Sequence, residues 1–480
     1  MLVFLGFAMI AVFMYLVMAR KATPIAVLIL IPVIFALIAG GRTDIGEMVE
    51  ESLLKLAPTA ALLFFAILFF CTMIDVGVFD PLIKAILRFA HGDPVRVTLG
   101  TALLTTIVSL DGDGSTTFII VTSAFLPIYL KLGMSPVVLT VIAALSNGVL
   151  NTVPWGGSTS RAAAALGVSP IDIFVPMIPA IAAGVITVLV LAYFLGAGER
   201  RRIGKLELRG ESVLSGLSPR DRKRAEELGT TGGSGATGDT ETAPSDAAAM
   251  PESGDAVQQT QGTEDSTQLL ERPKARPKLW WINLALTLAV MVLLVIDFVF
   301  PALIFMVGAA IALVLNFRKA GDQIRQFEDH APSIITVVGM VLAASVLTGV
   351  LDGTGMVSAM SSWLVDIIPT SWGPLMATIG GVLSIPFTFL MTNDAFYFGI
   401  LPILADAGAH YGIEPVEMAR AALVGQALHQ SSPLVASFLL LAGLAGVSIG
   451  DHFRKVLWRA VVASLVMLLV GGLTVAYPLL

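Results

Sequence analysis

Uncharged runs of about the length of a membrane span constrain this chain more than any other feature. Residues 1–19, 22–41, 56–74 and 173–198 each contain no Asp, Glu, Lys or Arg. A helix of about 20 apolar residues crosses the hydrocarbon core of a bilayer, and inside lipid the backbone polar groups must be satisfied within the protein. With 56% hydrophobic and 13% charged residues overall, the sequence predicts an all-α polytopic membrane protein.

The remaining composition excludes several other classes. The formal net charge is −6, and this acidic balance does not favour binding to nucleic acid. Cys71 is the one cysteine, which excludes an internal disulfide. Residues 1–19 contain no basic residue before their apolar stretch, so we expect a retained first span rather than a signal peptide.

A polar segment divides the chain. Residues 199–278 hold 13 of the 29 Lys and Arg residues, all near the two ends, and residues 225–271 hold none. Such a composition cannot bury enough apolar surface to offset the entropy of ordering, which predicts a disordered linker. We therefore expect a first transmembrane repeat at 1–198 and a second at 279–480.

Ordered landmarks indicate that the two halves are duplicates. A constant offset of 279 relates residues 151–154 (Asn-Thr-Val-Pro) to 430–433 (Gln-Ser-Ser-Pro) and the Gly-Val-Ser at 167–169 to that at 446–448. Each half is expected to hold about five spans, one re-entrant hairpin and one broken helix. An odd number of crossings inverts the second half, so the sequence predicts two inverted repeats, which are typical of secondary transporters.

Basic residues near the ends of the spans predict the orientation. Arg20, Lys21, Lys84, Arg88, Arg96, Lys131 and Arg200 to Arg202 fall on one side in the first half, and Arg318, Lys319, Arg325, Arg454, Lys455 and Arg459 fall on the same side in the second. The side with more Lys and Arg is cytoplasmic. Both termini are therefore expected outside the cell, with the linker in the cytoplasm.

Two aspartates lie within an apolar neighbourhood at the centre of the first half. Asp111 and Asp113 alternate with Gly112 and Gly114. One carboxylate facing lipid at the bilayer centre costs ~3 kcal/mol or more, and broken backbone at that depth must be covered by protein or line a cavity. This stretch is predicted to be the tip of a re-entrant hairpin that faces a polar site.

Three further interruptions are expected at the same site. Residues 391–394 correspond to a second hairpin tip, and residues 151–157 and 429–433 interrupt two spans. Pro154 and Pro433 are expected in the first turn of the half-helices that follow, where no N–H is lost. The free N–H groups of such half-helices favour an anion, whereas the aspartates favour a cation. The combination indicates an anion that travels with cations.

The interrupted elements resemble those of the citrate–divalent metal–proton symporters (CitMHS) of the ion transporter superfamily. The resemblance rests on residues 109–114 (Ser-Leu-Asp-Gly-Asp-Gly), 154–157 (Pro-Trp-Gly-Gly) through Arg161-Ala162, 398–402, 432–435 and 450–452. It implies a cell-membrane symporter rather than an enzyme. It also implies that citrate complexed with a divalent metal of the Mg or Ca type enters with protons, without a tightly bound cofactor. The resemblance to the superfamily further implies a homodimer in which a transport domain slides past a scaffold domain.

Candidate site residues follow from the tips and breaks. For the substrate we expect Ser115, Thr116, Asn151, Thr152, Gly156, Gly157, Ser158, Arg161, Thr392, Asn393, Gln430, Ser431 and Ser432, and for metal and proton Asp111, Asp113, Asp394 and His429. Two roles stay open: Arg161 either snorkels to the surface or binds a carboxylate, and His429 either handles a proton or packs. Asp75 and Asp352, at span ends, are interpreted as solvated caps.

Two alternatives remain. The first is a metal-independent carrier of di- or tricarboxylates on the same scaffold, which clustered hard carboxylate oxygens argue against. The second is an intramembrane aspartyl protease, because Gly112-Asp113-Gly114 resembles part of such a site and that chemistry needs two carboxylates sharing a proton. A protease does not need a duplicated architecture with paired hairpins.

Overall fold

The computed structural model describes residues 1–19, 21–40, 44–90, 93–112, 114–215, 274–296, 299–367 and 369–479. This part of the chain is helical and has no strand. Within it, seven helices are long and apolar enough to cross a membrane, and several shorter apolar helices accompany them. The predicted all-α polytopic class is confirmed.

The first half contains α1 (Leu2–Met18), α2 (Pro24–Ala39), α3 (Ile45–Asp75), α4 (Asp80–Phe89), α5 (Pro94–Val108), η1 (Ser109–Asp111), α6 (Gly114–Lys131), α7 (Pro136–Leu150), α8 (Gly157–Leu166) and α9 (Pro170–Ser215). Local chemistry sets several helix starts. Pro24 and Pro94 begin α2 and α5, and the preceding side chains, Thr23 and Asp93, accept hydrogen bonds from backbone N–H groups of the first turn.

The second half contains η3 (Pro277–Leu279), α11 (Trp280–Ile296), α12 (Pro301–Asn316), α13 (Ala320–Gly353), α14 (Met356–Ile367), η4 (Thr370–Leu375), α15 (Met376–Leu390), η5 (Ala395–Ile400), α16 (Leu401–Ala409), α17 (Pro415–Ala422), η6 (Leu423–Gly425), α18 (Gln426–His429), α19 (Ala436–Leu444) and α20 (Ile449–Leu473). Both halves thus end in a helix pair with a break, a broken span and a long helix. The inverted relation between them stays a prediction.

The chain divides into two compact units, Met1–Glu199 with Glu271–Leu480 and Arg200–Leu270. Both predicted repeats therefore contribute to one unit. The predicted linker boundaries fall inside described structure, because α9 continues to Ser215 and η3 begins at Pro277. Residues 216–273, which form most of the predicted linker, lie outside the described residues.

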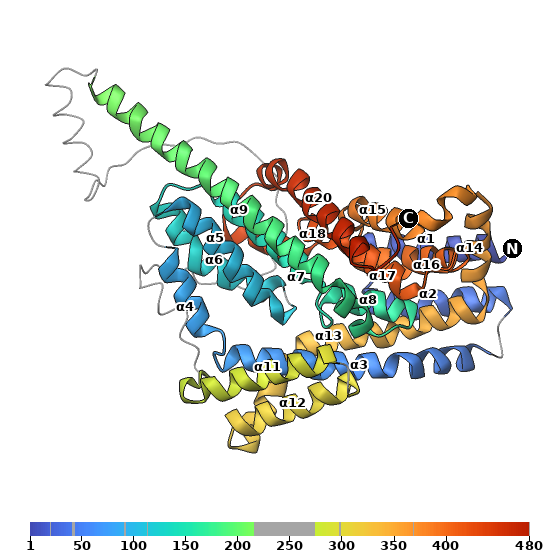
Figure 1. Ribbon diagram of the computed structural model, residues 1–480. Helices are drawn as coiled ribbons and strands as arrows, with labels where there is room; N and C mark the ends of the chain where they lie inside the picture. The colour runs from blue at the N-terminus through green and yellow to red at the C-terminus, as the bar shows by residue number, and fades with distance from the viewer. Residues whose placement is uncertain are drawn as a thin grey trace, which may run out of the picture. The chain divides into compact units, whose positions relative to one another are not determined.

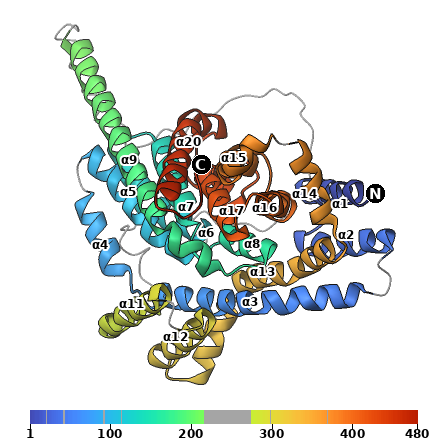
Figure 2. The same cartoon turned by 45° about the vertical axis from the view of Figure 1, so that its right-hand side comes forward.

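The long helices α3 and α13 form an antiparallel pair that holds the two halves together (Figures 1 and 2). Ser52 near the start of α3 lies 2.6 Å, Oγ to Oγ1, from Thr348 near the end of α13. At the opposite end of the pair, Asp75 contacts His330. A helix from each predicted repeat therefore crosses the unit beside the other, and each end of the pair has its own polar contacts.

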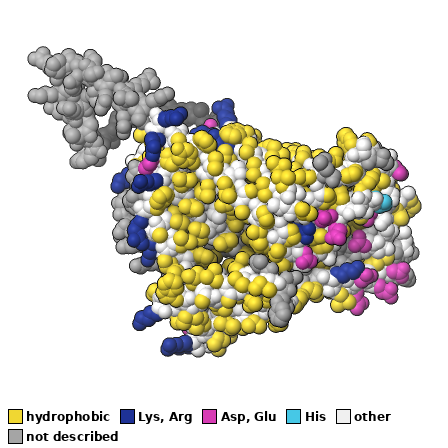
Figure 3. Space-filling model, in the orientation of Figure 1, with side chains coloured by type: hydrophobic (Ala, Val, Ile, Leu, Met, Phe, Trp, Pro, Cys, Tyr) yellow, Lys and Arg dark blue, Asp and Glu magenta, His cyan; other side chains and the backbone are white. Residues whose placement is uncertain are grey.

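Charged side chains are unevenly distributed on the face drawn in Figure 3. Lys and Arg side chains gather toward the end that holds α4, and most Asp and Glu side chains gather toward the end that holds α14, while apolar side chains cover the region between. An apolar band between two charged ends is what a membrane-spanning protein requires.

Candidate functional site

The first predicted tip is a helix pair with a break. The helices α5 and α6 run antiparallel, with Thr101 and Tyr129 joined by their hydroxyl oxygens at 3.2 Å. Between them η1 ends at Asp111, and Gly112 takes φ +80°, a conformation that favours glycine. Only the backbone of Asp111 is described, and Asp113 lies outside the described residues. The predicted break is present, and the contacts of its two carboxylates stay predictions.

This tip packs directly against the first broken span. The indole Nε1 of Trp155 donates a 2.7 Å hydrogen bond to the carbonyl oxygen of Leu110. A Cβ added at Gly112 would lie 3.1 Å from the Trp155 ring, a tight contact that also favours glycine here. Asn147 Nδ2 donates to Ser109 Oγ at 2.9 Å. Trp155 therefore fixes the first break against the first tip.

The start of α6 meets the second broken span. A Cβ added at Gly114 would lie 2.8 Å from Ser437 Oγ and 3.0 Å from Gln430 Nε2. The Gln430 amide donates to Ser437 Oγ at 3.0 Å, which holds these two polar groups beside the tip. The first tip thus lies between the two breaks, one from each half of the chain.

The second tip is joined to the first break by an ion pair. Helix α15 ends at Leu390, and the Thr392 hydroxyl accepts from Ala395 N at 3.2 Å, where the π-helical η5 begins. Arg161 Nε donates to Asp394 Oδ1, and its Nη1 donates to Gly157 O at 2.6 Å. Arg161 therefore points into the protein toward a carboxylate and does not snorkel to the surface.

Gln426 is a central residue that the sequence reasoning missed. Its Nε2 donates to Asn393 Oδ1 at 3.0 Å and to Tyr397 OH at 2.8 Å, and its Oε1 accepts from Asn151 Nδ2 at 3.3 Å. One fully buried amide thus links the first break, the second tip and the second broken span. A glutamine inside an apolar run was the available signal.

Several predicted ligands already donate hydrogen bonds within the protein. Ser158 Oγ donates to Asn151 O at 2.7 Å, Thr152 Oγ1 to Val149 O at 2.7 Å and Ser432 Oγ to Phe389 O at 2.6 Å. These bonds shape the breaks. A hydroxyl oxygen has two acceptor lone pairs, and that of Ser432 already accepts from Leu434 N at 3.3 Å.

Two predicted site residues at the second break, His429 and Ser431, are buried. His429 Nδ1 faces the Thr388 carbonyl oxygen, so this nitrogen carries the hydrogen. Ser431 Oγ lies 3.1 Å from His452 Nε2, and the other ring nitrogen of His452 lies 3.0 Å from Thr140 Oγ1. The packing role left open for His429 has direct geometric support.

The expected position of the two break prolines was wrong. Helix α8 begins at Gly157 and α19 at Ala436, three residues after Pro154 and Pro433 respectively. Each proline instead occupies the second position of a turn, closed by Gly156 N to Val153 O at 2.8 Å and by Val435 N to Ser432 O at 3.0 Å. The fixed φ of proline suits this position as well as it suits the first turn of a helix.

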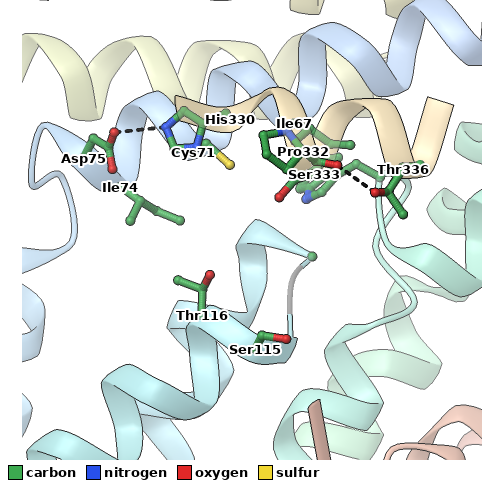
Figure 4. A pocket seen from close by; sticks show the side chains of 13 residues that line it. Ile67, Cys71, Ile74, Asp75, Ser115, Thr116, His330, Pro332, Ser333 and Thr336 are labelled. Carbon is green, nitrogen blue, oxygen red and sulfur yellow. Dashed lines mark hydrogen bonds and ion pairs between the residues drawn. The ribbon is translucent and has the colours of Figure 1, made fainter. Parts of the chain in front are cut away.

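A cavity of about 440 Å³ opens beside the first tip (Figure 4). Its lining includes Gly112, Ser115 and Thr116 from the tip and Trp155 from the first break. The opposite wall comes from α3 and α13 and contributes Cys71, Asp75, Ile67, Ile74, His330, Pro332, Ser333, Thr336 and Val337. Its volume falls within the about 300–1,000 Å³ of small-molecule sites. Asp75, interpreted from the sequence as a solvated cap, lies in this wall with paired contacts.

Within the described residues, no group of three or more His, Cys, Asp and Glu side chains lies close enough to hold a metal ion. The side chain of Asp111 and the whole of Asp113 lie outside the described structure.

Comparison with known proteins gives the family. The model of the citrate transporter family CitMHS matches residues 13–425. The chain is similar to a citrate transporter of Bacillus subtilis (strain 168), with 42% identity over 467 residues that cover 97% of each protein. It is also similar to the Mg(2+)/citrate complex secondary transporter of that organism, with 41% identity over 481 residues, 99% of this chain and 100% of the relative. The chain belongs to the CitMHS family of citrate transporters.

Proposed function

We propose that this transporter carries citrate complexed with a divalent metal ion into the cell, together with protons. The observation that carries the proposal is the meeting of both tips and both breaks around polar groups, next to the cavity of about 440 Å³. One relative, 41% identical, is named for transport of the Mg(2+)/citrate complex. Family membership places the chain among transporters, so the aspartyl protease alternative is set aside.

The anionic part of the complex is assigned to the breaks. Helices α8 and α19 begin after Gly156 and Val435, neither of which has a side chain able to cap the first N–H groups. Such amides favour carboxylates. Asn151, held by Gln426, adds a neutral amide near the start of α8. We therefore propose that citrate carboxylates bind at these half-helix ends, with Gly157, Ser158, Ser431 and Ser432 beside them.

The cationic part is assigned to the first tip. Asp111 and Asp113 are the proposed oxygen ligands of the metal ion carried by citrate, since hard divalent cations prefer carboxylate oxygens. Asp394 already faces the guanidinium of Arg161, which balances its charge. We propose that Asp394 and Arg161 act as a unit that joins the second tip to the first break, rather than as a free metal ligand.

The proposed orientation in the membrane follows from the distribution of Lys and Arg. Both termini lie outside, the linker is cytoplasmic, and the cavity lies toward the end of α3 that the basic residues mark as cytoplasmic. The gathering of Lys and Arg toward the α4 end in Figure 3 supports this orientation. A homodimer is proposed from the resemblance to the superfamily alone.

Uptake into proteoliposomes tests the function. Labelled citrate is supplied with Mg²⁺, Ca²⁺, Mn²⁺ or a chelator, with and without an inward proton gradient. The proposal expects uptake only with a suitable divalent ion and stimulation by the gradient. Equal uptake in the chelator would instead establish the metal-independent carboxylate carrier.

A further inference from the structure

A cluster of charged and polar groups forms the wall of the cavity opposite the first tip. One oxygen of Asp75, Oδ2, lies 2.7 Å from Gln326 Nε2, 3.0 Å from His330 Nε2 and 3.4 Å from Lys274 Nζ. Lys274 also pairs with Asp329 at 2.5 Å. Three separate stretches of chain, the end of α3, the first turns of α13 and the segment before η3, converge on this single carboxylate.

The orientation of the Gln326 amide is fixed by its neighbours. Lys274 Nζ, which can only donate, lies 2.8 Å from Gln326 Oε1, so the amide NH₂ faces Asp75 and His330. The Nε2 atom of His330 lies 3.0 Å from Gln326 Nε2 and 3.0 Å from Asp75 Oδ2. This ring nitrogen therefore faces a donor and an acceptor at once.

That arrangement accommodates His330 with and without a proton on Nε2. With the proton, Nε2 donates to Asp75. Without it, Nε2 accepts the second N–H of Gln326 while the first N–H still donates to Asp75. In both states His330 Nε2 and Asp75 Oδ2 keep a hydrogen-bond partner with the heavy atoms in place. The second N–H of Gln326 has an acceptor only when Nε2 carries no hydrogen.

The charge of the cluster also favours one exchangeable proton. Asp75 and Asp329 carry two negative charges and Lys274 one positive charge, so the sum is −1 with neutral His330 and zero with the protonated ring. Burial lowers the pKa of Lys274, but hydrogen bonds and charges from Asp329 and Asp75 outweigh it and leave that pKa above its ordinary value. Lys274 therefore keeps its proton.

Within the described residues, Arg276 and Cys71 are two further titratable groups beside this cluster. The Arg276 guanidinium donates to Asn316 O at 3.3 Å. Cys71, one helical turn before Asp75, shares the cavity wall, and an ordinary thiol titrates near pH ~8.5. Histidine is the side chain whose unperturbed charge changes between about pH 5 and 8.

We propose that Asp75 and His330 bind the proton that accompanies the substrate, an inference that rests on the proposed function. Both side chains line the same cavity as Ser115 and Thr116 of the first tip, and Figure 4 shows them on the wall across from these hydroxyls. Protonation removes the negative charge of the cluster from the wall, which favours entry of an anionic metal–citrate complex. By reciprocity, the bound anion favours the protonated pair.

The test compares exchange with accumulation in proteoliposomes. His330→Gln and Asp75→Asn should still exchange labelled metal–citrate between equal pools on the two sides. A gradient of one pH unit drives about tenfold accumulation per coupled proton at most, and both variants should reduce this toward no accumulation. His410→Gln, an exposed histidine bonded to Asp406 O at 2.9 Å, is the matched control and should retain both activities.

Three results separate the possibilities. Full gradient-driven accumulation in His330→Gln or Asp75→Asn overturns the proton site and leaves the proposed function intact. Loss of exchange in both variants, with inserted and monodisperse protein, also overturns it, because the pair would then belong to substrate binding. Absence of metal–citrate exchange in the unmodified protein would instead refute the proposed function.

A third variant gives a readout if the first two do not insert. Gln326→Leu removes the amide that donates both to the Asp75 carboxylate and to the unprotonated His330 nitrogen. The protonated pair becomes relatively more favourable, so the pH dependence of uptake should move to higher pH. A pH profile identical to that of the unmodified protein would overturn the assignment.

Discussion

The ion pair between Arg161 and Asp394 gives the sharpest quantitative prediction. The two residues are 233 positions apart and join the first break to the second tip, with side chains only 20% and 11% exposed. Arg161 is also held by Gly157 O at 2.6 Å, so it cannot turn away readily. Asp394→Asn keeps the shape of the side chain but leaves a guanidinium without a counter-charge.

The expected loss follows from this burial. Removing one partner of a desolvated pair costs about 2 to 5 kcal/mol, largely because the other charge is left unpaired. Arg161→Gln should cost a similar amount for the same reason. The double variant contains no unpaired charge, so it should be more stable than the sum of the two losses predicts by about 1 kcal/mol or more.

Equilibrium unfolding in mixed micelles measures these differences, and α3 supplies a matched control. Lys55 and Glu51 form a 2.8 Å ion pair with side chains 60% and 72% exposed. Neutralising either partner there should cost about 0 to 1 kcal/mol. Losses at Arg161 and Asp394 no larger than those at the control pair, or losses that simply add in the double variant, would refute the assignment of this pair as a buried connection between tip and break.

Three further predictions address the metal, the topology and the linker. Asp113→Asn removes a charge and hard-oxygen affinity, so it should abolish metal-dependent uptake while the protein still inserts. Unchanged uptake and metal preference in Asp113→Asn would exclude Asp113 from the site. Ser432→Ala removes one neutral hydrogen bond, worth about 0.5–1.5 kcal/mol, and should weaken uptake about tenfold at most with every metal alike. In a Cys71→Ala background, Ser234→Cys should be protected from an impermeant thiol reagent in intact cells and Pro478→Cys should react, whereas equal labelling would contradict the five-span inverted count. Deleting residues 229–263 should leave uptake nearly unchanged because flexible connections shorten at small entropic cost, and loss of transport in a normally inserted protein would contradict the linker interpretation.

Local chemistry made the interruptions of the helices predictable. Glycine at 112 and 114, and the polar runs at 151–157, 391–394 and 429–433, conflict with a continuous apolar helix, and the structure breaks its helices at each of them. These signals lie within a few residues of sequence. The placement of Pro154 and Pro433 failed because proline fits both a first helical turn and a β-turn, and the following Gly156 and Val435 delay the helix.

Contacts between distant parts of the chain could not be predicted in this way. Gln426 is visible in the sequence only as a glutamine inside an apolar run, and its central position depends on the approach of Asn151 and Asn393. Asp75 has the sequence signature of a solvated helix end. Its proposed role in proton binding depends on the antiparallel packing of α3 against α13 and on the return of the chain at Lys274. No local pattern encodes those approaches.

Simultaneous measurement of citrate and metal entry shows whether the two cross the membrane as one complex. Proteoliposomes receive doubly labelled substrate, and the amounts of citrate and of divalent metal inside are counted in the same vesicles. Transport of the complex predicts that metal enters only when citrate is present, and that the two accumulate in a constant ratio for every metal that supports uptake. Citrate entry without metal, or metal entry that does not depend on citrate, would contradict it.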